Sequence, residues 1–181
     1  MKKILGTIVV LLVLGLAGGV WFAYSGIYNV AATSRDPAAV RWLLHTTMQN
    51  SVEKRAAKVR VPADFSPNDP QTLKVGFEHY NEMCTVCHGA PGVEPGEARA
   101  GLNPKPPSLV DHAREMSPKE LFWVIKHGVR MTGMPAWGPT HSDAKIWAMV
   151  AFVKHLPDMT AADYRAMREQ AEDADHADHA H

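Results

Sequence analysis

Two cysteines and a histidine, Cys84, Cys87 and His88, form a C-x-x-C-H pattern, which constrains the chain more than any other feature. This pattern is typical of covalent haem attachment, in which each thiol adds to one vinyl group and the histidine ligates the iron. A structural zinc site would need two further thiolate or histidine ligands, and the chain has no third cysteine. A redox-active dithiol would need a βαβ context that this region lacks. The sequence therefore predicts one covalently bound haem c.

The amino terminus reads as a membrane anchor. Lys2 and Lys3 precede an uncharged run from Ile4 to Tyr24, and a helix of that length spans a hydrocarbon core of roughly 30 Å. The apolar core of a signal peptide is normally shorter, and the two lysines hold the first residues in the cytoplasm. We expect residues 1–30 to be an uncleaved, single-pass signal anchor in a bacterial inner membrane, with everything after it in the periplasm. Cleavage near Val30 is the alternative.

Residues 31–70 are expected to form a juxtamembrane helix and a linker. Apolar side chains recur there at helical spacing, and they are Val40, Leu43, Leu44, Met48 and Val52. Lys54, Arg55, Lys58 and Arg60 crowd the end of this helix. Two placements stay open: the helix lies on the lipid surface with its cations near phosphates, or it packs on the domain that follows.

Residues 71–160 are expected to form a helical domain. Gly76, Tyr80 and Cys84 recur every four residues and share one helix face. A glycine inside a helix costs about 1 kcal/mol relative to alanine, so Gly76 predicts a close crossing by the last helix of this domain, residues 142–156. A further helix is expected over residues 117–127, since Ser117 and Glu120 form a capping box.

A second ligand candidate is Met134, which follows Gly133 and precedes Pro135. A methionine thioether is the soft ligand that pairs with histidine in electron-transfer haems. Met131 competes, but the proline stiffens the backbone beside Met134, and Trp137 can close the pocket. A lone methionine more often fills a core, so the assignment depends on the haem motif upstream.

Taken together, these residues resemble the class I cytochrome c family, in particular its membrane-anchored mono-haem members from proteobacteria. The resemblance covers roughly residues 72–157. It implies an all-α fold of three main helices around one haem, with thioether bonds at Cys84 and Cys87 and axial ligands at His88 and Met134. It also implies that a proline carbonyl accepts the N–H of the ligand histidine; we predict Pro104, with Pro106 and Pro107 as alternatives.

The tail, residues 161–181, is acidic and rich in histidine near its end. We expect it to be disordered. Loose binding of a divalent metal by His176, His179 and His181 is the alternative.

The predicted function is electron transfer rather than enzymatic catalysis, because a haem with both axial positions filled offers no open site for a substrate. The chain is expected to connect a redox donor and acceptor of a respiratory chain, such as a dehydrogenase and a terminal oxidase or reductase. A permanent cytochrome subunit of a membrane dehydrogenase or oxidase complex is the alternative, and an enzyme or gas sensor would need a vacant iron position. The only basic cluster is short and adjoins the membrane segment, which argues against nucleic acid as a partner.

Overall fold

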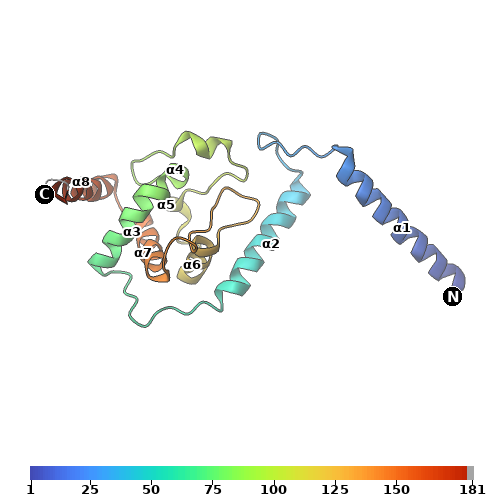
Figure 1. The fold of residues 1–181 in the computed structure, drawn as a ribbon, viewed down its shortest axis with the longest axis horizontal. Coiled ribbons are helices and arrows are strands. Elements are labelled where there is room, and N and C mark those ends of the chain that lie inside the picture. The colour runs from blue at the N-terminus through green and yellow to red at the C-terminus, as the bar shows by residue number, and fades with distance from the viewer. Residues whose placement is uncertain (179–181) are drawn as a thin grey trace. The chain divides into compact units, whose positions relative to one another are not determined.

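The computed structural model describes residues 1–178 of the 181. Over this range every regular element is a helix, apart from an isolated bridge between Ala90 and Val93. The all-α fold class is thereby confirmed (Figure 1). The chain divides into two units, Met1–Arg35 and the part from Asp36 onward, and each is described by itself.

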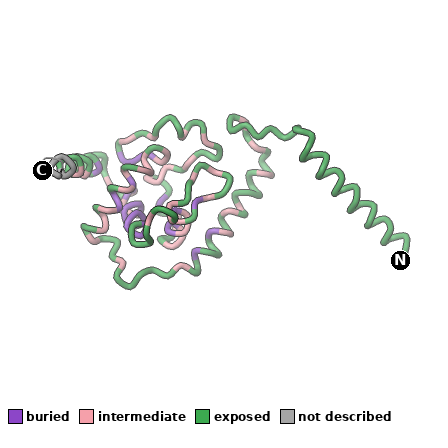
Figure 2. The backbone as a smooth tube through the Cα atoms, in the orientation of Figure 1, coloured by how far each residue is buried: buried purple, intermediate pink, exposed green. Residues whose placement is uncertain are grey.

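The first unit consists of helix α1, Lys2–Ser25, and the segment after it. None of its residues is buried (Figure 2). The helix has a mean hydropathy of 2.4, and within the described residues it alone is long and apolar enough to cross a membrane. It ends at Gly26, whose φ of 65° places it in the left-handed region that favours glycine. The helix covers the predicted apolar run, while its role as an anchor stays a prediction.

The core of the second unit is the crossing of α3, Pro70–Met83, with α7, Asp143–His155. A methyl group on Gly76 would overlap the carbonyl of Ala148 and lie 2.8 Å from the Cβ of Phe152. The close crossing predicted from Gly76 is therefore confirmed. Helix α6, Pro118–His127, packs beside α7 and carries the predicted capping box of Ser117 and Glu120. Figure 2 shows the buried residues gathered where these helices meet.

Helix α2, Ala38–Ala56, packs on α6 and belongs to the same unit as the domain that follows it. Its buried residues, Val52 and Ala56, lie in its last turns. The second of the two placements left open by the sequence is therefore correct for this half of the helix. The linker also contributes to the core, since the ring of Phe65 lies 4.9 Å from that of Trp147.

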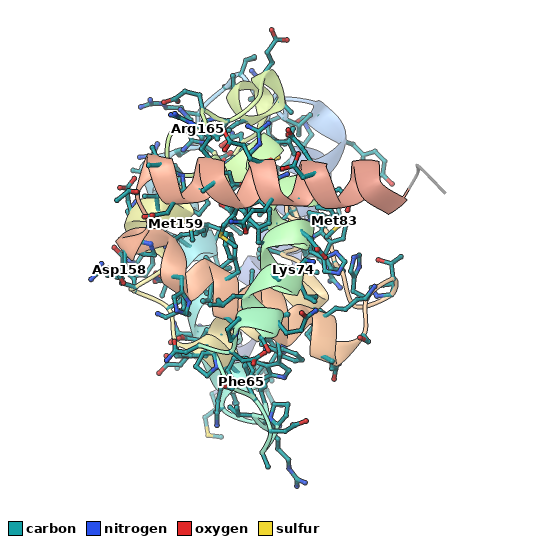
Figure 3. The ribbon with its side chains drawn as sticks, turned by 90° about the vertical axis from the view of Figure 1, so that its left-hand side faces the viewer. Phe65, Lys74, Met83, Asp158, Met159 and Arg165 are labelled. Atoms are coloured by element: carbon teal, nitrogen blue, oxygen red, sulfur yellow. The ribbon has the colours of Figure 1, made fainter. Side chains whose placement is uncertain are left out.

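Helix α8, Ala161–Asp178, overturns the prediction of a disordered tail for the described part of residues 161–181. The helix starts with a reciprocal cap, in which Thr160 and Asp163 each accept a hydrogen bond from the backbone N–H of the other. Tyr164 is buried, and its ring lies 5.4 Å from that of Phe77 in α3. Figure 3 views the face on which α8 runs across α3. Metal binding by the terminal histidines concerns side chains that lie outside the described residues.

Candidate haem-attachment site

The attachment motif is one helical turn at the end of α3. Cys84 caps α3, and α4, Thr85–His88, follows directly. The backbone N–H groups of Cys87 and His88 both donate to the carbonyl of Cys84, at 3.1 and 2.9 Å. Both cysteines are free thiols, and burial raises the pKa of Cys84 to about 12. Two unpaired thiols on a single turn fit the attachment of one porphyrin through its two vinyl groups.

His88 is oriented by one hydrogen bond. Its Nδ1 lies 2.8 Å from the carbonyl oxygen of Pro107. A carbonyl oxygen only accepts, so Nδ1 carries the proton and the lone pair of Nε2 is free for a metal. Burial lowers the pKa of His88, and the nearby Arg99 cation acts in the same direction. The ring is therefore held as a neutral imidazole in the tautomer that an iron ligand requires.

The prediction of Pro104 as the partner of His88 is wrong. The carbonyl of Pro107, nineteen residues after the histidine, makes the contact. The chain reaches it through the 3-10 helix η1, Glu97–Gly101, whose Arg99 donates from Nε to the carbonyl of Pro106 at 3.1 Å. With the Pro106 carbonyl bound to Arg99, the next carbonyl along the chain is presented to the imidazole. Helix α5, Leu109–His112, begins two residues after Pro107.

Two further hydrogen bonds connect α3 to the motif and to the residue that follows it. The hydroxyl of Tyr80, which is fully buried, donates to the carbonyl of Gly89 at 2.6 Å. Thr85 donates from its hydroxyl to the carbonyl of Asn81 at 2.8 Å. The φ of 70° at Gly89 lets the chain reverse directly after His88. Sequence reasoning placed Tyr80 on the motif face of its helix but did not identify the carbonyl that it binds.

The methionine segment forms a closed loop after α6. The N–H of Val129 donates to the carbonyl of Met134 at 3.1 Å. Inside the loop, the Thr132 hydroxyl donates to the Val129 carbonyl at 2.7 Å and accepts from the N–H of Met134 at 3.1 Å. Gly128 has a φ of 64°, and a Cβ there would lie 2.7 Å from the Met134 carbonyl oxygen. The loop is thus held by its own backbone and by Thr132, a residue that the sequence analysis did not single out.

The two methionines of this loop lie in different surroundings. Met131 is 80% exposed and has a φ of 61°. Met134 is half-buried and packs against the core. A Cβ on Gly133 would lie 2.6 Å from the side chain of Leu102, so the loop rests on the segment that leads from the motif to Pro107. The loop therefore contacts the segment that precedes Pro107 through Gly133, with Met134 partly covered and Met131 in solvent.

The remaining side chains offer no second metal centre in the part of the chain that the structure describes. Within it, no group of three or more histidine, cysteine, aspartate or glutamate side chains is placed to hold an ion. Two thiols and one imidazole on a single turn are donors that fit a covalently attached haem, with the thioether of Met134 as the candidate for a second axial ligand.

Residues 71–153 match a protein-family model described as cytochrome c oxidase, cbb3-type, subunit III. A comparison with curated proteins found no match to the chain. The matched range begins in the first turn of α3 and ends in α7. It therefore contains the attachment motif, Pro107 and the methionine loop, and leaves out α1, α2 and α8.

Proposed function

We propose that the chain is a class I c-type cytochrome that carries single electrons through one haem c ligated by His88 and Met134. The match of residues 71–153 to a cytochrome family model supports this proposal. The observation that carries this proposal is the bond from Nδ1 of His88 to the Pro107 carbonyl, next to two free thiols on one turn. When bound, the haem supplies one-electron exchange between Fe(III) and Fe(II).

The protein's own residues hold and tune that group. Cys84 and Cys87 are the thioether sites, and Pro107 keeps the imidazole of His88 in one tautomer and orientation. Met134 is preferred over Met131 as the sixth ligand because it is half-buried and its N–H and carbonyl are both bonded within the loop. A thioether ligand raises the reduction potential relative to a second imidazole, which suits delivery of electrons to a strong oxidant.

The proposed location is a bacterial inner membrane, with α1 as a single uncleaved span and the haem domain in the periplasm. The length and hydropathy of α1 support this, as do Lys2 and Lys3 at its start. A carrier held there exchanges electrons with a donor such as a dehydrogenase and an acceptor such as a terminal oxidase or reductase of a respiratory chain. Mass spectrometry of membrane-extracted protein should find Trp21 in the mature chain, and a chain that begins near residue 31 would refute the anchor.

A second candidate is a permanent cytochrome subunit of a membrane dehydrogenase or oxidase complex. The description of the matching family, which names an oxidase subunit, favours it. Extraction in mild detergent separates the two candidates, because a subunit co-purifies with its complex in fixed proportion and a free carrier does not.

The ligand assignment is tested by near-infrared spectroscopy of the oxidised protein, which shows a weak charge-transfer band when sulfur ligates the iron. Met134→Ala should abolish this band and lower the reduction potential. Met131→Ala is the matched control in the same loop and should leave both unchanged. Loss of the band in Met131→Ala with its retention in Met134→Ala would reverse the assignment. Rapid binding of carbon monoxide by the reduced wild-type protein would point instead to a vacant iron position.

A further inference from the structure

Helix α2 carries more apolar surface than the haem domain covers. Every fourth position is apolar, and this stripe consists of Val40, Leu44, Met48, Val52 and Ala56. Only Val52 and Ala56, at its carboxyl end, are buried against the rest of the unit. At the other end of the helix Trp42 is 68% exposed and Leu43 is 56% exposed. The first half of α2 thus exposes large apolar side chains, with Val40 only partly covered, which is unusual for a helix in contact with water alone.

Trp42 and Leu43 lie off the stripe, and both are largely exposed. Leu43 precedes Val52 by nine residues, which is two and a half helical turns, so the two side chains are on opposite sides. By the same rule Trp42 lies closer in direction to Ala56 and Val52, and its exposure shows that the domain does not cover this end of the helix. These two side chains can therefore be covered by an outside surface without any change in the contact between α2 and α6.

The exposed residues of α2 are more apolar in its first turns than in its later turns. Its first turns expose Ala39, Trp42 and Leu43, whereas its later turns expose Gln49, Asn50 and Glu53. The apolar part is the end nearest to α1 in the chain. Only residues 26–37 separate α1 from α2, and a fully extended chain of that length reaches at most about 40 Å. If α1 spans a membrane, Trp42 is therefore confined close to the surface of that membrane.

The charge around α2 also suits a lipid surface. The cations Arg35, Arg41, Lys54, Arg55, Lys58 and Arg60 outnumber the carboxylates Asp36 and Glu53. Anionic headgroups attract such basic segments that lie next to a span. Tryptophan prefers the boundary between headgroups and acyl chains, because its ring is apolar and its N–H is a donor. The exposed apolar side chains and the positive charge of α2 therefore both favour a lipid surface as its partner.

We propose that Trp42 and Leu43 insert into the headgroup boundary of the bilayer that α1 spans, so that the first turns of α2 rest on the membrane surface. This inference rests on the anchor proposed above.

The test is electron paramagnetic resonance of nitroxide labels on the full chain, reconstituted into vesicles of phosphatidylcholine and phosphatidylglycerol. The haem is kept reduced so that low-spin iron is diamagnetic. Labels are placed at L43C and, as the matched control on the outward side, at N50C. The label at position 43 should be severalfold more accessible to oxygen than to a water-soluble nickel chelate, relative to the label at position 50.

A third label, V9C, lies within α1 and reports whether the anchor itself is inserted. An aqueous signal at position 9 would refute the anchor and with it this inference. A lipid signal at position 9 with aqueous signals at both 43 and 50 would overturn this inference alone. Protection of position 43 in native membranes but not in the vesicles would also overturn it, because the face would then bind a protein. An unchanged haem absorption spectrum shows that each labelled variant is folded.

Discussion

Removal of the Tyr164 side chain should destabilise the haem domain, although this residue lies outside the range that matches the cytochrome family. Tyr164 is only 1% exposed. Its ring lies 5.4 Å from that of Phe77 in α3 and 6.4 Å from that of Phe152 in α7. Its hydroxyl donates to the side-chain oxygen of Asn81 at 2.9 Å. The first turns of α8 therefore close the crossing of the two main helices.

The expected magnitude follows from these contacts. Replacing a buried aromatic side chain by alanine costs about 3–5 kcal/mol. Tyr164 belongs to an outer helix that can partly collapse into the space, so we expect Tyr164→Ala to lower the free energy of unfolding by about 3 kcal/mol. Tyr164→Phe keeps the ring and loses one hydrogen bond, which is worth about 1 kcal/mol. The partner oxygen of Asn81 is only partly buried and can be rehydrated, which keeps that cost small.

Guanidinium unfolding of the detergent-solubilised full chain, followed by circular dichroism of the haem band, measures these differences. Arg165→Ala is the control, because Arg165 is the exposed neighbour of Tyr164 in the same helix and should change stability by less than about 0.5 kcal/mol. If Tyr164→Ala unfolds within about 1 kcal/mol of the wild type, α8 is not part of the cooperative unit and the reasoning fails.

Three further predictions concern the helix crossing, a partly buried histidine and the effect of charge on electron transfer. Gly76→Ala should destabilise the domain by about 3 kcal/mol, since the added methyl group overlaps the backbone of α7, whereas Gly101→Ala, with open space around it, should not; chemical unfolding compares them. Burial, and then the nearby His141 and Lys145, lower the pKa of His79, so the folded state resists its protonation. The free energy of unfolding should therefore fall as pH drops below about 6.5, and His79→Gln should reduce that fall when unfolding is measured near pH 7 and pH 5. If α1 tethers the protein to a membrane, Arg130→Glu, at an exposed position of the methionine loop, should slow oxidation by a purified terminal oxidase by less than about threefold, because a tethered carrier needs little charge steering; a steep fall of the stopped-flow rate with salt would contradict this.

The parts of the fold that follow local rules were predictable from the sequence. Gly76 predicted a helix crossing because a glycine inside a helix is destabilising unless another backbone approaches closely. The structure shows that the backbone of α7 does so at Ala148. The capping box of Ser117 and Glu120 fixed the start of α6 to the residue. In both cases a few residues, acting over one turn or one contact, are enough to determine the outcome.

Two predictions are wrong, the proline partner of His88 and the disordered tail. The three candidate prolines, Pro104, Pro106 and Pro107, have chemically identical carbonyls, so the sequence could not show that Arg99 binds Pro106 and leaves Pro107 to the histidine. The acidic composition of the tail predicts disorder. Tyr164, Met167 and Ala171 recur there at helical spacing and pack against the core, a signal that was present but outweighed by the charges around it.

The two segments proposed as iron ligands are each held by bonds that do not involve the haem. The imidazole of His88 is fixed by Pro107, and the loop of Met134 is closed by Val129 and Thr132. A ligand that is positioned by its own surroundings keeps its orientation when the charge on the metal changes. The protein therefore does not have to rearrange the ring tautomer or the loop when one electron arrives or leaves. This is the property that a one-electron carrier requires, and it comes from residues that sequence motifs alone do not reveal.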